Sequence, residues 1–135
     1  MYKVTKVMDF SYGHRLLNYE GKCRQFHGHN GKVEVELFSE KLDDQGMVLD
    51  FSQINKIIKE WINENLDHKL LLSKDDPMVK IMEENNEEVF VMETNPTAEA
   101  IAKLIYDFAL SKDLPVKEVR LWETDNSFAV YNGKE

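Results

Sequence analysis

Residues 20–32 read E-G-K-C-R-Q-F-H-G-H-N-G-K and hold the only cysteine of the chain, Cys23, followed closely by His27 and His29. Two residues separated by one position in an extended segment point to the same side, about 7 Å apart along the strand. The two imidazoles can therefore share one metal ion. An isolated H-x-H pair also suits a strand entrance with two solvated or core histidines, so the surrounding sequence has to decide between the two interpretations.

His14 supplies the third imidazole that such a metal site needs. It ends an apolar run that can pair antiparallel with the run beginning near Asn30. Alternating apolar residues share the face of His14 on the first strand and the face of His27 and His29 on the second: Val4, Met8, Phe10 and Tyr12, then Val33, Val35 and Leu37. Three imidazoles at one end of a hairpin fit zinc, whose fourth tetrahedral position would stay open for water or substrate.

The composition is that of an ordinary globular protein of one domain. The chain has 135 residues, of which 42% are hydrophobic and 31% charged, and its formal net charge is −8. This acidity argues against nonspecific nucleic-acid binding and against docking on an anionic membrane. The N-terminus enters a strand pattern directly, with no targeting segment or membrane-spanning run, so we expect a cytoplasmic protein.

Cys23 is the candidate nucleophile or base. A single cysteine cannot form an internal disulfide, and Lys22 and Arg24 flank it in the sequence. Positive charge nearby, including that of a bound metal ion, favours the thiolate form. The alternative interpretation is a small, half-buried side chain without a chemical role.

The hydrophobic pattern predicts strands over residues 2–12, 32–38, 116–123 and 128–131. One main helix is expected to begin at Asp50, which forms a capping-box pattern with Gln53, and to end near Leu66. The second main helix is expected to begin within residues 94–97, with Pro96 in its first turn. A short helix is expected at Asp76, followed by a solvated loop over residues 83–88.

These elements predict an α+β fold, a four-stranded antiparallel sheet with the two main helices on one face. No repeat or linker divides the chain. Four strands leave two open edges, which proteins commonly cover or pair, so closure of the sheet through neighbouring subunits is expected.

Two further acidic positions belong to the candidate site. Asp67 stands beside His68, and a carboxylate next to an imidazole can set its tautomer and raise its basicity. The alternative is a helix-end aspartate next to a surface histidine. Glu123 ends a strand on the face of apolar residues, where a carboxylate is costly to bury unless it binds something. The edge of a cyclic amidine or guanidine-like ring would suit it.

Six motifs follow one another over most of the chain: F-S-Y-G-H-R-L at 10–16, C-R-Q-F-H-G-H at 23–29, G-M-V-L-D-F at 46–51, L-D-H at 66–68, P-T-A-E at 96–99 and E-T-D-N at 123–126. With these motifs the sequence resembles the 6-pyruvoyl-tetrahydropterin synthase and 6-carboxytetrahydropterin synthase superfamily, a branch of the tunnelling fold. The resemblance implies one domain of this type over residues 1–135. It further implies a trimeric β-barrel of four-stranded subunits, often stacked into a homohexamer, with active sites at the subunit interfaces.

The resemblance also assigns roles to the candidate residues, position by position. It implies that His14, His27 and His29 bind zinc, that Cys23 is the catalytic thiol, and that Asp67 and His68 complete proton transfer. Glu123 resembles the pterin anchor of the family, with Thr97 and Glu99 near the same ring.

The three residues between Cys23 and His27 are similar to the spacing in the bacterial 6-carboxy-5,6,7,8-tetrahydropterin synthases of queuosine and 7-deazaguanine biosynthesis. The implied substrate is 7,8-dihydroneopterin triphosphate, and the implied products are carboxytetrahydropterin, acetaldehyde and triphosphate. Triphosphate elimination to a pyruvoyl product and a catalytically silent zinc- or pterin-binding paralogue are the alternatives. Tyr12 and Gly13 depart from the small, alanine-like residues common before the first histidine, and Gly31 from a common tyrosine, which affects mainly the expected substrate.

Overall fold

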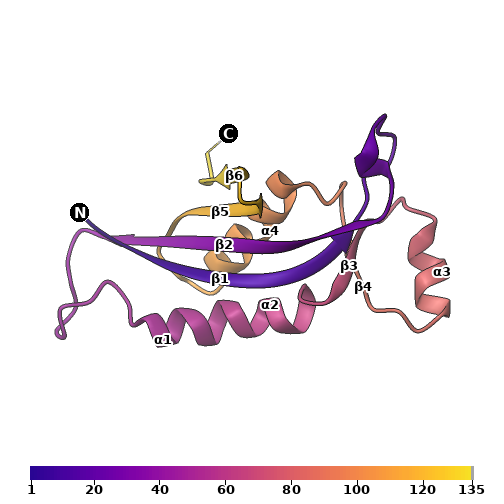
Figure 1. Ribbon diagram of the computed structural model, residues 1–135. Helices are drawn as coiled ribbons and strands as arrows, with labels where there is room; N and C mark the ends of the chain where they lie inside the picture. The colour runs from indigo at the N-terminus through magenta and orange to yellow at the C-terminus, as the bar shows by residue number, and fades with distance from the viewer. Residues whose placement is uncertain (135) are drawn as a thin grey trace.

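The computed structural model describes residues 1–134, so Glu135, the last residue of the expected domain, lies outside the described part. Six strands are present: β1 (Tyr2–His14), β2 (His27–Ser39), β3 (Lys69–Ser73), β4 (Val89–Met92), β5 (Val116–Thr124) and β6 (Ser127–Tyr131). The helical elements are η1 (Lys22–Arg24), α1 (Phe51–Ile54), η2 (Asn55–Lys59), α2 (Glu60–Asn65), α3 (Met78–Glu84) and α4 (Ala98–Ser111) (Figure 1). Within residues 1–134, each helix is too short or too polar to cross a membrane.

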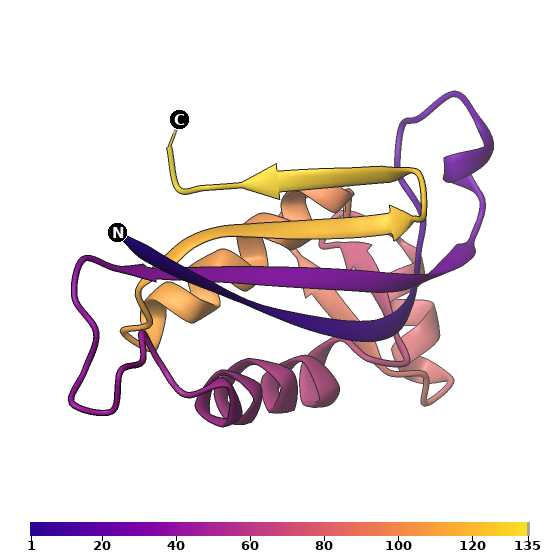
Figure 2. The same ribbon diagram turned by 60° about the vertical axis from the view of Figure 1, so that its left-hand side comes forward.

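The β1–β2 hairpin forms the centre of the sheet, and its two strands pair in the expected register. His14 pairs with His27, and Tyr12 pairs with His29. Since side chains alternate between the two faces of a strand, all three histidines lie on the face that carries the buried apolar residues. The two long strands run side by side through the centre of the sheet and curve toward the end where the histidines lie (Figures 1 and 2).

The expectation of a four-stranded antiparallel sheet is wrong. The sheet has six strands in the order β4-β3-β1-β2-β5-β6, and β3 pairs parallel with both β1 and β4. The four expected strands do form a continuous antiparallel unit, β1-β2-β5-β6. Residues 69–73 read K-L-L-L-S, a short apolar run without alternation, which is the pattern of a strand buried in a parallel arrangement and is difficult to recognise from periodicity.

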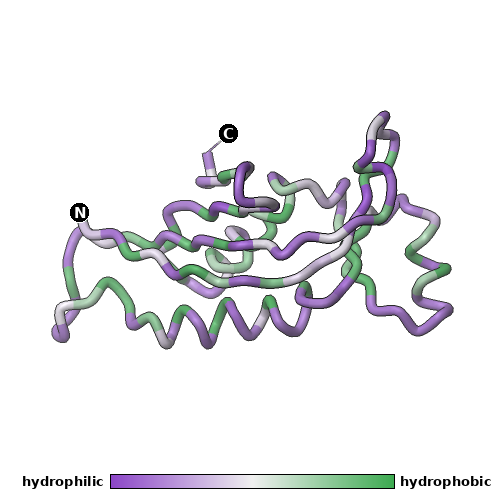
Figure 3. The backbone as a smooth tube through the Cα atoms, in the orientation of Figure 1, coloured by the Kyte–Doolittle hydropathy of each residue, from purple (hydrophilic) through white to green (hydrophobic). Residues whose placement is uncertain are grey.

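Both main helical segments pack on one face of the sheet, as expected. The first is a continuous helical run from α1 through α2, with a π-helical stretch, η2, in its middle. Its buried side chains join those of α4 and the strands in a single core, which includes Met8, Val33, Leu121, Ile58 and Ile105. Apolar positions recur along both helical segments and alternate with polar ones (Figure 3). The helices therefore cover the same face of the sheet as the one on which the histidines lie.

The helix ends follow from local capping chemistry. The side chain of Asp50 accepts a hydrogen bond from the Ser52 N–H at the start of α1. The Thr97 hydroxyl accepts one from the Ala100 N–H at the start of α4, so Thr97 is the cap, and Pro96 precedes the helix instead of lying in its first turn as expected. The segment expected as a loop over residues 83–88 begins two residues later, because α3 extends to Glu84.

Candidate functional site

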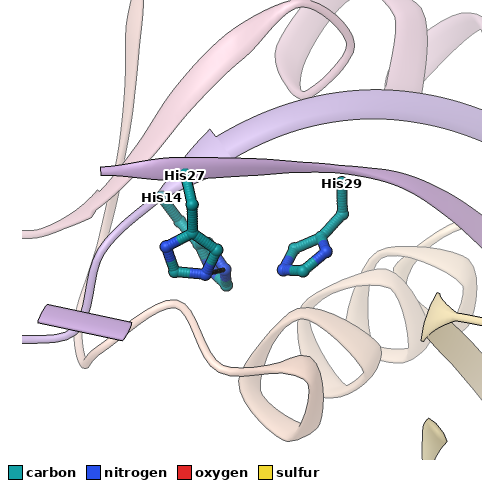
Figure 4. A group of neighbouring side chains, drawn as sticks. All are labelled: His14, His27 and His29. Atoms are coloured by element: carbon teal, nitrogen blue, oxygen red, sulfur yellow. Dashed lines mark hydrogen bonds between the residues drawn. The ribbon is translucent and has the colours of Figure 1, made fainter. Parts of the chain in front are cut away.

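The three histidines form one cluster at the end of the hairpin. His14 is the last residue of β1, and His27 and His29 are the first and third residues of β2. Their rings extend from the same side of the hairpin toward the turn that precedes α4 (Figure 4). One ring nitrogen from each histidine lies within 4.8 Å of those from the other two. Among residues 1–134, these three side chains form the group that could hold a metal ion. The sequence prediction of three converging imidazoles is confirmed.

Backbone carbonyls determine which nitrogens face the centre of the cluster. His14 Nδ1 lies 2.7 Å from the Pro96 carbonyl oxygen, and His27 Nδ1 lies 2.8 Å from that of Gln25. A carbonyl oxygen only accepts, so each Nδ1 carries the proton. In the neutral rings the Nε2 atoms are then unprotonated, yet those of His14 and His27 are 3.0 Å apart. Two lone pairs at this distance repel one another unless a cation lies between them.

The surroundings of His14 favour a metal ion over a proton as that cation. His14 is buried, and burial lowers the pKa of its imidazole, as do the neighbouring His27 and His29, whereas the Pro96 carbonyl and Glu123 act in the opposite direction. Neutral imidazoles whose other nitrogen donates to a carbonyl are the usual ligands of zinc. The donor set therefore fits zinc.

Glu123, near the end of β5, lies beside the cluster. Its Oε2 atom is 3.7 Å from His14 Nε2 and 3.7 Å from His29 Nε2. The Tyr12 hydroxyl donates a hydrogen bond of 3.5 Å to the same oxygen. Burial raises the pKa of the Tyr12 phenol, and the charge and hydrogen bonding of Glu123 raise it further. Tyr12 stays a neutral donor, a contact that the sequence analysis did not foresee.

The other residues expected to bind the substrate lie at the start of α4. Glu99 and Glu123 both line a hollow of about 340 Å³, together with Ala98, Ser127, Phe128, Ala129 and Val130. Thr97 is occupied as the cap of α4 and follows Pro96, whose carbonyl holds His14. Two carboxylates in one hollow suit a ligand edge that offers several N–H donors.

Asp67 and His68 form a hydrogen-bonded dyad. His68 Nδ1 lies 2.8 Å from Asp67 Oδ2, and Asp67 Oδ1 accepts from the Ser11 N–H at 2.9 Å. Burial alone would raise the pKa of the Asp67 carboxyl, but the Ser11 and His68 hydrogen bonds hold it below its ordinary value. The His68 side chain is 81% exposed, so its Nε2 is open to a proton donor or acceptor from outside the dyad.

Within residues 1–134, no hydrogen bond joins the dyad to the histidine cluster, although both border one hollow. His68 lines a hollow of about 610 Å³ along with His27 and His29 of the cluster and with the strand residues Ser11, Gly13, Gly28 and Asn30. The four strand residues Ser11, Gly13, Gly28 and Asn30 alternate with the histidines along β1 and β2, so their side chains belong to the opposite face of the sheet. Cys23 lies in η1, half-buried, on the connection between β1 and β2, and it lines neither this hollow nor the one beside Glu123.

Residues outside the predicted set hold the β1–β2 connection in place. The Arg15 guanidinium makes two hydrogen bonds to the Asp76 carboxylate, at 2.8 and 2.6 Å, and lies over the Phe26 ring. The Asn95 side chain accepts from the Leu17 N–H and donates to the Leu17 carbonyl. These partners are about 60 and 80 positions apart in sequence. A local sequence pattern therefore cannot predict such pairs.

The comparisons with known proteins agree with this geometry. The sequence model of the family described as 6-pyruvoyl tetrahydropterin synthase matches residues 3–134. A protein named 6-carboxy-5,6,7,8-tetrahydropterin synthase from Rickettsia conorii is 36% identical over 135 residues, which cover 95% of this chain and 98% of the relative.

Among solved structures, an uncharacterized protein from Wolinella succinogenes has a TM-score of 0.81 at 28% identity and covers 98% of each chain. The 6-pyruvoyl tetrahydropterin synthase of Caenorhabditis elegans has the same fold, with a TM-score of 0.74 at 23% identity over 98% of this chain and 96% of that one. The chain belongs to the 6-pyruvoyl tetrahydropterin synthase family of enzymes.

Proposed function

We propose that this protein is a zinc-dependent lyase that converts 7,8-dihydroneopterin triphosphate to 6-carboxy-5,6,7,8-tetrahydropterin, with release of acetaldehyde and triphosphate. The observation that carries the proposal is the convergence of three imidazoles beside the Glu123 carboxylate. The name of the Rickettsia relative supports the carboxy product. The product would enter queuosine and 7-deazaguanine biosynthesis in the cytoplasm.

The metal would be held by His14, His27 and His29. A zinc ion bound there would act as a Lewis acid toward oxygens of the substrate side chain. The protein prepares this site in advance, because the Pro96 and Gln25 carbonyls keep His14 and His27 in the tautomer that offers Nε2.

The pterin ring would be recognised by carboxylates. Glu123 and Glu99 line one hollow next to the histidines, and carboxylates accept hydrogen bonds from the ring N–H and amino groups of a pterin. Thr97 begins the helix that carries Glu99 and sets the position of that helix start. A ring held there places its side chain toward the histidine cluster.

Proton transfer would fall to Cys23 and to the Asp67–His68 dyad. Asp67 fixes the His68 tautomer, leaving Nε2 as the exchanging atom. Because no hydrogen bond joins the dyad to the three histidines within residues 1–134, we infer that the dyad of one subunit serves the metal centre of its neighbour. This supports an assembly in which the open edges of β4 and β6 pair between subunits, as a trimer or a hexamer built around a β-barrel.

A second candidate function keeps the same site but eliminates triphosphate to give a pyruvoyl product, and the family description favours it. A silent zinc- or pterin-binding paralogue is a third candidate, motivated by the departures at Gly13 and Gly31. Mass spectrometry of the pterin formed from dihydroneopterin triphosphate separates them. A carboxy product supports the lyase, a pyruvoyl product supports the second candidate, and unchanged substrate with bound zinc supports the third.

A further inference from the structure

Tyr12 and Gly31 occupy complementary space on the buried face of the hairpin. Gly31 pairs across the strands with Phe10, and Tyr12 pairs with His29. A Cβ atom added at Gly31 would lie 3.0 Å from Cε1 of the Tyr12 ring and 3.3 Å from a methyl carbon of Leu121. The Tyr12 ring thus fills the volume that a side chain at position 31 would need. Of the three departures from the family pattern, those at Tyr12 and Gly31 are therefore one structural feature.

The Tyr12 ring joins the histidine cluster to Glu123. Its centroid lies 5.2 Å from that of His14, edge to face, and 5.6 Å from that of His29. Its hydroxyl donates to Glu123 Oε2. The side chain is only 3% exposed, and it stacks on Phe10 at 5.0 Å, so the ring has little freedom to move. The hydroxyl is therefore held at a fixed place relative to two metal ligands and the carboxylate.

Glu123 needs a donor at this place. Its Oε2 lies 3.7 Å from the Nε2 atoms of His14 and His29. The lone pair of His14 Nε2, whose Nδ1 donates to the Pro96 carbonyl, repels a carboxylate while no metal ion is bound. The Tyr12 hydroxyl, 3.5 Å from that oxygen, donates to the carboxylate and offsets this repulsion.

We propose that Tyr12 is a positioning residue, whose hydroxyl holds the Glu123 carboxylate beside the metal centre, and that Gly31 provides the space that allows the Tyr12 ring to reach it. The identity of the ligand that Glu123 receives rests on the proposed function. The placement of the carboxylate does not depend on that identity.

Tyr12→Phe tests the proposal, because it removes the hydroxyl and keeps the ring. Tyr106→Phe is the matched control, since Tyr106 packs against Tyr131, away from the cluster. We expect Tyr12→Phe to bind one zinc per subunit like the parent protein and the control. A crystal structure of the zinc-loaded variant should show Glu123 displaced. An unmoved Glu123 carboxylate in that structure overturns the proposal.

Equilibrium binding of neopterin, followed by fluorescence, supplies the second readout. Tyr12→Phe should weaken binding by about three- to tenfold, the usual effect of losing one hydrogen bond, whereas Tyr106→Phe should leave it unchanged. In a Glu123→Gln background the Tyr12→Phe change should have no further effect, because the two residues act together. Independent, additive losses would contradict the proposal.

Failure of the proposed function gives a different result. If the zinc-loaded parent protein binds no neopterin, the pterin assignment fails, while the Glu123 position in the two crystal structures still decides the role of Tyr12. Gly31→Ala provides a further check, because its Cβ would push on the Tyr12 ring. Like Tyr12→Phe, it should move the Glu123 carboxylate away from its position in the parent protein. An unchanged carboxylate position in Gly31→Ala would contradict the role given to Gly31.

Discussion

The Nε2 atoms of His14 and His27 lie 3.0 Å apart, and the Nδ1 of each ring faces a backbone carbonyl. This relationship makes the cluster a cation site before any cation arrives, because both rings present lone pairs to the same point. The hairpin register brings the two residues face to face, and the Pro96 and Gln25 carbonyls fix their tautomers.

Removal of the metal should destabilise the fold. Chelation should lower the thermal midpoint of unfolding, and added zinc should restore it. Bound zinc should raise the free energy of unfolding by about 2.7 kcal/mol when free zinc exceeds its dissociation constant roughly a hundredfold. His14→Ala should abolish this response. His68→Ala is the control, since His68 is exposed and outside the cluster, and it should keep both the bound zinc and the response. Loss of zinc in both variants would contradict the assignment of ligands.

Mixed oligomers test whether active sites are shared between subunits. Cys23→Ala and His68→Ala should each be inactive by themselves. Co-expressed and assembled together, they should recover activity in roughly a quarter of the sites, because each shared site draws one residue from either subunit at random. The measurement is turnover per bound zinc in the mixed assembly. Complete inactivity of a verified mixed oligomer would place Cys23 and His68 of the same chain in one site.

The Arg15–Asp76 pair should contribute stability that depends on pH. The Arg15 guanidinium holds the pKa of the Asp76 carboxyl below its ordinary value, against the opposing effect of burial. A carboxyl with a lowered pKa in the folded state contributes fully above its unfolded pKa, about 3.9, and loses the contribution as the pH falls through the folded pKa. Urea unfolding of the parent protein should therefore weaken more steeply below pH about 4 than that of Asp76→Asn.

Asp76→Ala should also cost about 1.5–3 kcal/mol at neutral pH, the usual contribution of hydrogen bonds to a charged group, because the Asp76 side chain is 0% exposed and that of Arg15 only 22% exposed. Glu93→Gln is the matched control. Glu93 pairs with Lys74 on the surface, and exposed pairs contribute little, so its unfolding free energy should stay close to that of the parent. Equal losses in the two variants would show that burial of the pair is not what matters.

An exchange of side chains tests the complementary fit of positions 12 and 31. Tyr12→Ala alone should cost about 3–5 kcal/mol through the cavity it leaves, and Gly31→Tyr alone about 1–3 kcal/mol or more through overpacking. The double variant should be more stable than the sum of the two losses predicts, since the new ring occupies the vacated space. Chemical denaturation of all three proteins measures the coupling. Strict additivity would mean that the two positions do not share one volume.

The hairpin and its histidines were predictable because a strand alternates its faces with period two. Parity alone placed His14, His27 and His29 on one face, and the register confirmed it. The two main helices were predictable for a similar reason, since apolar residues recur with helical spacing and Asp50 is a recognisable cap.

The features that could not be predicted from the sequence depend on contacts between distant segments. The apolar run of β3 is too short and uniform to distinguish a strand from other buried segments. The Tyr12–Glu123 hydrogen bond joins β1 to β5, which are separated in the sheet by β2, and it forms because the Tyr12 ring lies over Gly31. The carbonyl that orients His14 belongs to Pro96, and a backbone carbonyl leaves no signature in a sequence.

The decisive measurement is turnover of dihydroneopterin triphosphate by protein of known zinc content, with acetaldehyde and the pterin product quantified in the same sample. We expect equal amounts of acetaldehyde and carboxytetrahydropterin from zinc-loaded protein and neither from chelated protein. A pyruvoyl product without acetaldehyde, or no turnover at one zinc per subunit, would contradict the proposed lyase reaction.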